Sequence, residues 1–233
     1  TATFKEVLSA RPDFVWSTMA LQYISALKED YAEAFRLLDQ LIAGMEDERS
    51  PGSGFFARLP KGFLWAWLGN MEKASIEFDR ITDVADRLGN EEMKALVDET
   101  KAWSYYDRGD LELSQSCFEK MEAYLAQTYS DSAKNMPLGK PPAYLANFNS
   151  GLLELRLGHV DAAKSRLAAI KSLLSNSEIG KDFNYNLLRG EILISEGKSQ
   201  EAISVLEKAP PKILISLSSG NTQMVYNFPF CKD

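Results

Sequence analysis

Few side chains in this 233-residue chain could carry out catalysis or hold a metal. His159 is the only histidine, so a Ser-His-Asp triad has a single candidate base, and a metal site built on two histidines is excluded. Carboxylates are abundant, as in Glu91-Glu92 and Asp98-Glu99, and a pair of them could serve acid–base catalysis. These acids fall at expected helix starts and on expected solvent faces, where they usually interact with the helix dipole. We therefore expect no enzyme activity, no cofactor and no metal; the alternative is a hydrolase-type enzyme on an α/α scaffold, with acidic residues in a central cleft.

Composition narrows the class of protein further. Apolar residues make up 45% of the chain and charged residues 25%, as in ordinary globular proteins. The net charge is −7 and no basic stripe is visible, which argues against a nucleic-acid partner. Cys117 and Cys231 are too few for a disulfide framework, which favours a reducing, cytoplasmic compartment. No run approaches the roughly 20 apolar residues of a membrane span, so we expect no direct membrane insertion.

A spacing pattern recurs around four glycines that separate apolar segments. Each glycine has a small residue seven positions before it, a small residue five positions after it and a large apolar residue nine positions after it. The glycines are Gly69, Gly109, Gly158 and Gly197; the residues seven before are Gly62, Ala102, Gly151 and Gly190; those five after are Ala74, Ser114, Ala163 and Ala202; those nine after are Phe78, Phe118, Leu167 and Leu206. Glu29 stands in place of the glycine in an earlier copy.

This pattern is typical of a helical hairpin. A glycine can adopt positive φ and close the end of a helix, and small residues on both helices let the two backbones approach. One hairpin cannot bury both of its faces, so the copies must stack. The sequence therefore predicts an all-α fold of stacked antiparallel helix pairs.

We expect one array that is a fragment of a longer protein; the alternative is a natural protein with half-repeat caps. Its expected parts are a partial repeat at 1–12, hairpins at 13–44, 55–88, 91–127, 142–174 and 179–208, and a connector at 210–233 that begins a further repeat. Pro60 suggests that its helix begins near that residue. The polar stretch from Thr128 to Pro142 is the best hinge candidate. Apolar surface at the ends predicts self-association through Phe4 and Val7, or through Tyr226, Phe228 and Phe230; the alternative is that these segments fold back and cover the adjoining hairpin.

This set of offsets resembles the tetratricopeptide repeat family. The matching features are a small residue seven positions before the glycine, an Ala or Ser five positions after it and a large apolar residue nine positions after it. Pro12, which follows Phe4, Val7 and Leu8, matches the terminal proline of that repeat. The resemblance covers nearly the whole chain. Departures are Glu154 and Ser25 in place of an aromatic residue, Gln22 in place of glycine, and a turn-to-turn spacing of 39 to 49 residues against about 34 in the family. A HEAT-like or other helical-hairpin solenoid also fits this spacing. The resemblance implies a right-handed α-solenoid.

In this family the first helix of each hairpin lines a concave surface, and that implies which residues would bind a partner. The expected partner-binding residues are Trp16, Tyr23, Phe56, Phe63, Trp67, Glu99, Trp103, Tyr106 and Phe148. The same offsets reach Met19, Leu59 and Leu145. The alternative is that these side chains are packed inside the array. The family's clamp for a peptide carboxylate needs Lys, Arg and Asn on this surface, and this chain has mainly apolar residues there.

The expected function is that of a non-enzymatic protein- or peptide-binding scaffold or sensory module of a larger bacterial protein. Glu99 and Asp107 favour a ligand with basic or neutral polar groups around an apolar anchor, such as an amphipathic helix or an extended peptide. A further alternative is a self-assembly module, in which the repeats stack on themselves.

Overall fold

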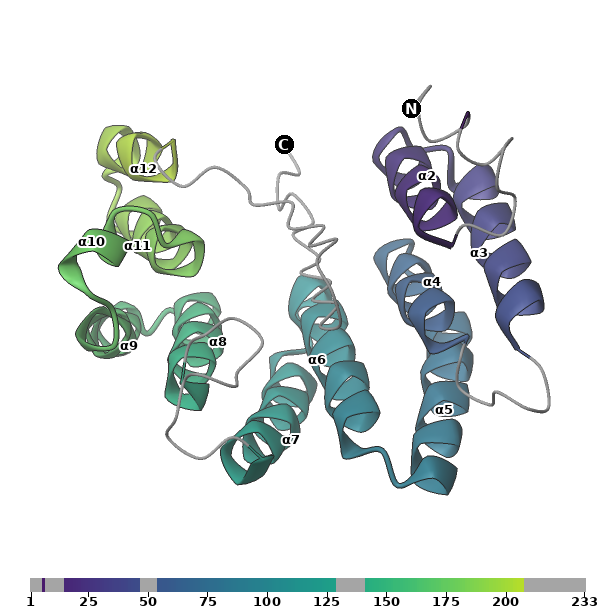
Figure 1. The fold of residues 1–233 in the computed structure, drawn as a ribbon. Helices are drawn as coiled ribbons and strands as arrows, with labels where there is room; N and C mark the ends of the chain where they lie inside the picture. Colours follow the sequence, from purple (N-terminus) through teal and green to yellow (C-terminus); the bar gives the residue numbers. More distant parts are fainter. Residues whose placement is uncertain (1–5, 7–14, 47–53, 129–140, 208–233) are drawn as a thin grey trace. The chain divides into compact units, whose positions relative to one another are not determined.

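The computed structural model describes residues 6, 15–46, 54–128 and 141–207, which form α-helices joined by short turns (Figure 1). No strand occurs within these ranges, so the predicted all-α class is confirmed. The side chains of Trp16 and Ser177 are outside the description. The expected partial repeat at 1–12, most of the hinge candidate and the connector at 210–233 also lie outside the described residues. The predicted self-association through the chain ends rests on those segments.

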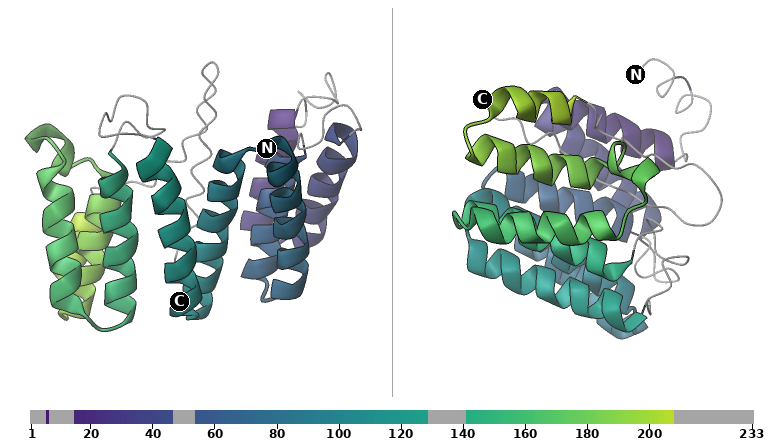
Figure 2. Two further views of the ribbon diagram at one scale, coloured as in Figure 1. Left: turned by 90° about the horizontal axis from the view of Figure 1, so that it is seen from below. Right: turned by 90° about the vertical axis from the view of Figure 1, so that its left-hand side faces the viewer.

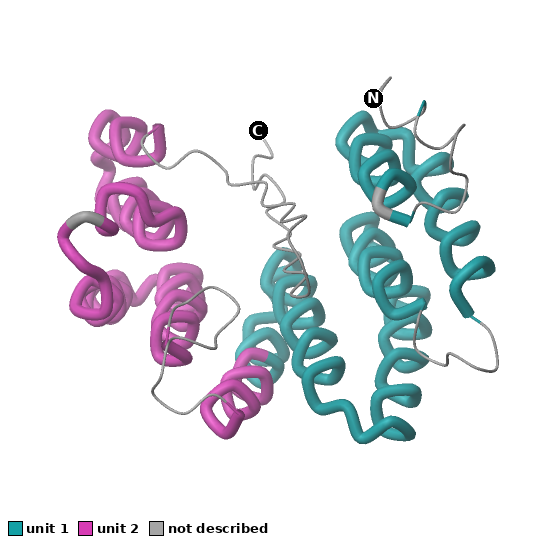
Figure 3. Tube along the Cα trace, in the orientation of Figure 1, with its two compact units in different colours: residues 1–117 teal, residues 118–233 magenta. Residues whose placement is uncertain are grey.

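The chain divides into two compact units, residues 1–117 and 118–233 (Figure 3). Unit 1 contains α2 (Val15–Leu27), α3 (Tyr31–Met45), α4 (Phe55–Trp67), α5 (Met71–Leu88), α6 (Glu91–Arg108) and the first part of α7 (Leu111–Thr128). Unit 2 contains the rest of α7, α8 (Pro142–Arg156), α9 (Val160–Ser172), α10 (Asn176–Ile179), α11 (Phe183–Ser195) and α12 (Ser199–Leu206).

Successive helices pack in pairs inside each unit. In unit 1, α2 packs on α3 and α4 packs on α5; in unit 2, α8 packs on α9 and α11 packs on α12 (Figure 2). Neighbouring pairs also touch, because α4 contacts α3 and α6, and α11 contacts both α8 and α9. Each unit therefore buries the second face of a hairpin against the next hairpin, as the repeat pattern requires.

The turn glycines adopt the backbone conformation that the spacing predicts. Gly69, Gly109, Gly158 and Gly197 all have φ between 75° and 82°, and each ends the first helix of a pair. Glu29 stands in place of the glycine in the first copy and has φ 61°. Among the residues that the structure describes, no other non-glycine residue has positive φ. The turn geometry is thus the same in all five copies, although one copy lacks the residue that adopts it most easily.

The small residues five positions after each turn glycine are buried. Ala74, Ala163 and Ala202 are buried, and Ser114 is fully buried with its Oγ donating a hydrogen bond to the Ala102 carbonyl oxygen at 2.9 Å. Phe78, the large residue of its copy, is fully buried in the core of unit 1. The helix pairs are therefore held by close backbone approach on one side and by large apolar side chains on the other.

Two expected boundaries were wrong. Helix α4 begins at Phe55, and Pro60 lies inside it rather than in its first turn. Proline removes one intrahelical hydrogen bond, but Pro60 is buried among neighbours, and packing offsets that loss.

The helix expected from 179 begins instead at Phe183, because Asp182 caps it. The Asp182 side chain accepts a hydrogen bond from Tyr185 N at 2.9 Å and another from the Tyr144 hydroxyl. The preceding residues form the separate short helix α10, whose start is fixed by a capping box between Ser175 and Glu178.

Candidate functional site

Helix α4 carries a row of aromatic side chains that stay partly accessible. Phe56, Phe63 and Trp67 are spaced seven and four residues apart, so they lie on one side of the helix. Phe63 and Trp67 stack with their ring centroids 6.5 Å apart and an interplanar angle of 23°. Phe56 is 40% exposed, and Phe63 and Trp67 are half-buried. The row therefore offers flat apolar surface on a rigid helix.

Helix α6, which packs on α4, adds an indole and a carboxylate. Glu99, Trp103 and Tyr106 follow at four- and three-residue spacing on one side of this helix. Trp103 is half-buried, and its ring meets the Tyr106 ring edge-on at 5.7 Å. Tyr106 itself is buried, with 8% of its surface exposed, so it offers little surface to a partner.

Glu99 is a half-buried acid. Burial raises the pKa of its carboxyl from the usual 4.5 to about 6, because a charged group loses hydration there. Among the described residues, none donates a hydrogen bond to this carboxylate or forms an ion pair with it. We call Phe56, Phe63, Trp67, Glu99 and Trp103 the α4–α6 surface.

The other expected binding residues lie elsewhere. Tyr23 of α2 is half-buried, and burial raises the pKa of its hydroxyl. Phe148 belongs to α8 in unit 2 and is 5% exposed, and Met19 and Leu59 are also buried. These buried side chains offer little surface to a partner, so the structure brings together only the α4 and α6 members of the predicted set.

Trp65 lies on the packing side of α4, against the core of unit 1. Its ring stacks on Phe35 of α3 with centroids 3.9 Å apart, and Lys73 Nζ of α5 lies 4.2 Å from its ring centroid. Trp65 thus joins three helices, while Trp67, two residues later, points away from that contact.

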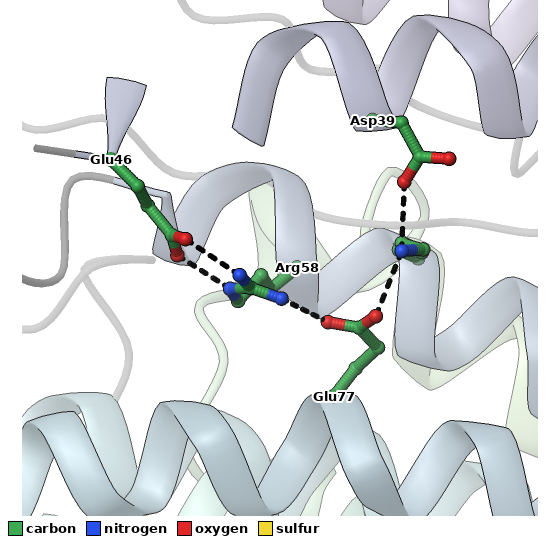
Figure 4. Close-up of polar contacts among 5 residues, drawn as sticks. Asp39, Glu46, Arg58 and Glu77 are labelled. Carbon is green, nitrogen blue, oxygen red and sulfur yellow. Dashed lines mark hydrogen bonds and ion pairs between the residues drawn. The ribbon is translucent and has the colours of Figure 1, made fainter. Parts of the chain in front are cut away.

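The sequence pattern did not reveal a buried ion network on the other side of α4 (Figure 4). The buried carboxylate of Glu77 on α5 pairs with Arg58 at 2.5 Å and with Lys61 at 2.8 Å. Arg58 also pairs with Glu46 at 2.5 Å, and Lys61 pairs with Asp39 at 2.8 Å. The network therefore ties the end of α3 to α4 and α5.

Charge pairing in this network is visible in the pKa values of its members. Hydrogen bonds from Arg58 lower the pKa of Glu46. Burial opposes the charge of Lys61, but hydrogen bonds to Asp39 and Glu77 outweigh burial and raise its pKa. The sequence signal was the basic pair Arg58 and Lys61, three residues apart on α4, together with an acid on the otherwise apolar side of α5. Helical spacing shows that such residues share a side, but not that this side is covered.

Groups suited to metal or catalytic chemistry do not gather in the part of the chain that the structure describes. No three His, Cys, Asp or Glu side chains there could hold a metal ion together. His159 is exposed in its turn and contacts Glu154 at 2.8 Å. In the described ranges, no helix combines the length and apolar character needed to cross a membrane.

Comparisons with known proteins bear on the fold alone. No protein-family model matches the chain, and no curated protein matches it. Among solved structures, the crystal structure of BtubC (BKLC) from P. vanneervenii is similar, with a TM-score of 0.59 and 14% sequence identity. The similarity covers 100% of this chain and 94% of that chain. At this low identity it supports the helical architecture and says nothing of a shared activity.

Proposed function

We propose that this chain is a non-enzymatic scaffold that binds a protein or peptide through the α4–α6 surface. We further propose that it is a right-handed solenoid of the tetratricopeptide repeat type, within a larger bacterial, cytoplasmic protein. The observation that carries the proposal is the stacked Phe63–Trp67 pair, which stays partly accessible on a helix that packs against α6, the helix of Trp103.

The apolar core of unit 1 does not need these rings. Helix α4 fills the core with other side chains, among them Phe55, Leu59 and Leu64, all of them buried. The row formed by Phe56, Phe63 and Trp67 on the same helix is only partly buried in this unit, so it leaves apolar surface accessible. Tryptophan is, with tyrosine and arginine, one of the residue types that most often dominate the binding energy at protein interfaces.

The surface suits an extended peptide or an amphipathic helix with an apolar anchor. Tryptophan and phenylalanine rings each offer about 150–250 Å² and lose little side-chain entropy on binding. Because they stand on helices rather than on loops, the surface is organised before the partner arrives. The partner's polar groups would then face Glu99.

Alanine substitution of the two tryptophans tests the proposal. Peptides are selected from a random displayed library on the full chain, and their affinities are measured for the Trp67→Ala and Trp103→Ala variants. Each substitution should weaken binding by roughly 2 kcal/mol or more if these residues are hot spots, with helical circular dichroism retained.

Ile76→Ala is the matched control. Ile76 is an exposed apolar residue of α5 outside the α4–α6 surface, so its loss should leave affinity unchanged. The proposal fails if no peptide is selected. It also fails if both tryptophan variants bind as the unchanged protein does, or if both unfold without a separable loss of binding.

A further inference from the structure

Glu99 differs from Glu122 and Glu191, two other carboxylates of the described residues whose pKa is raised mainly by burial, because each of those has a polar or charged neighbour. Glu122 accepts a hydrogen bond from Asn149 Nδ2 at 3.4 Å. Arg156 acts on Glu191 and opposes part of the effect of burial on its pKa. Within the described ranges, no such neighbour serves Glu99. A half-buried carboxylate in this position is expensive to keep charged unless a cation arrives from outside.

The basic residues of α4 and α6 do not supply that cation, because each is held by another carboxylate. The pairs are Lys94 with Asp86 and Glu91, Lys101 with Asp79, Arg108 with Asp110, Arg58 with Glu46 and Glu77, and Lys61 with Asp39 and Glu77. The basic side chains of α4 and α6 are therefore all paired with carboxylates other than Glu99.

The placement of Glu99 suits a planar cation. Glu99 and Trp103 are four residues apart on α6, which makes their side chains neighbours on the helix surface. Both are half-buried and so reachable from solvent. A guanidinium can form two parallel hydrogen bonds to a carboxylate and at the same time lie flat against an indole. An ammonium cannot make both contacts in this way.

We infer that Glu99 is the receptor for an arginine side chain of the bound peptide, with the guanidinium paired to the carboxylate and stacked on the Trp103 indole. This inference rests on the proposed function and names the partner's chemistry. The peptide would place its apolar side chain over Phe63 and Trp67, and its arginine about one helix width away, over α6. The net charge of −7 favours the approach of such a basic peptide.

Peptide selection from a random displayed library, run in parallel on the full chain and on its Glu99→Gln variant, tests the inference. Peptides selected on the unchanged chain should be enriched in arginine beside an aromatic or aliphatic residue. Selection on the variant should keep the apolar residue and lose the arginine. Glu92→Gln is the control, because it removes the same charge from an exposed position on the same helix. Its selected peptides should keep the arginine.

Affinity measurements with one selected peptide sharpen the result. Replacing its arginine by citrulline, a neutral side chain of nearly the same shape, should weaken binding to the unchanged chain about tenfold. The same replacement should change binding to Glu99→Gln less than twofold, because the charge partner is already gone. Circular dichroism and the denaturation midpoint of the variant establish that it remains folded.

The outcomes separate this inference from the proposed function. If peptides are selected without arginine enrichment, or if citrulline weakens binding equally in both proteins, the inference is overturned while the peptide-binding function stands. If Glu92→Gln loses arginine selection as Glu99→Gln does, the effect is general electrostatics and the inference is also overturned. If no peptide is selected at all, the proposed function fails and the inference fails with it.

Discussion

Gly62 of α4 leaves room for the ring of Phe78 on α5: a β-carbon added to Gly62 would lie 2.6 Å from Phe78 Cε1. The same relationship holds in unit 2, where a β-carbon on Gly190 would lie 2.6 Å from Leu206 Cδ2. In both cases the small residue is seven positions before the turn glycine and the large residue nine positions after it. This contact is therefore the physical reason for these two offsets in the copies around Gly69 and Gly197, whereas a β-carbon added to Gly151 would meet Leu188 Cδ2 at 2.6 Å instead.

Gly62→Ala should destabilise the protein by roughly 1–3 kcal/mol, because the added methyl group overpacks against a ring that is itself fully buried. Urea denaturation measures the change. Gly44→Ala is the control: Gly44 lies in helix α3 with no atom within 4 Å of an added β-carbon. Alanine there should stabilise the helix by up to about 1 kcal/mol. Equal effects of the two substitutions would contradict this account of the offsets.

Much of the fold follows from such local relationships, which is why the sequence predicts it. Turn glycines, small residues and large apolar residues recur at fixed distances, and each distance corresponds to one contact inside a hairpin. The start of α11 could not be predicted in this way. It depends on Asp182, whose capping role is strengthened by the hydroxyl of Tyr144, a residue 38 positions earlier in the chain.

The candidate site was predictable only in part, for a similar reason. Helical spacing places Trp67 and Tyr106 on expected sides of their helices, but spacing alone cannot say how far a neighbouring helix covers each side. Trp67 is half-buried, while Tyr106 and Phe148 are buried. The ion network around Glu77 was missed because its members come from three helices and share no repeated offset.

Glu29→Gly should stabilise unit 1 by about 0.5–1 kcal/mol. Glu29 has φ 61°, and a left-handed backbone costs a residue with a β-carbon roughly 1–2 kcal/mol, part of which glycine gives back through its greater freedom when unfolded. Gly69→Ala, at φ 82°, should show the opposite sign. A lower denaturation midpoint for Glu29→Gly would show that the glutamate side chain stabilises the protein by more than its backbone strain costs.

Glu77→Ala should cost about 3 kcal/mol, because it leaves Arg58 and Lys61 in a mostly buried position with one carboxylate fewer. Glu33→Ala removes the partner of Arg36 in an exposed pair and should cost less than about 1 kcal/mol. Thermal denaturation at low salt and in 1 M NaCl compares the two. Salt should abolish the Glu33 effect and leave most of the Glu77 effect, since buried pairs are screened less. A Glu77 effect that vanishes in salt would mean that the network is effectively solvated.

Glu99→Gln should make the protein more stable above neutral pH, with a gain that depends on pH. Burial raises the pKa of Glu99 from 4.5 to about 6, so the folded state favours the protonated acid. The stability that this acid contributes is fully present below pH 4.5 and is lost as the pH rises through 6. A rise of this size corresponds to about 2 kcal/mol. Glutamine carries no charge at any pH, so the difference in unfolding free energy between the variant and the unchanged protein should grow by up to about 2 kcal/mol between pH 4 and pH 8.

Urea denaturation across that pH range measures this difference, with Glu92→Gln as the control. Glu92 is exposed on the same helix, so its substitution controls for the general effect of removing one negative charge. If the difference in unfolding free energy for Glu99→Gln does not change with pH, Glu99 is fully hydrated in the folded protein. A bound cation would then bring this carboxylate no relief from burial. If the profile rises as expected, the arginine peptide should flatten it for the unchanged protein, because a bound cation restores the charged carboxylate to a favourable setting. A binding group can destabilise the free protein, and its ligand then removes that cost. A structural group would stabilise the free protein instead.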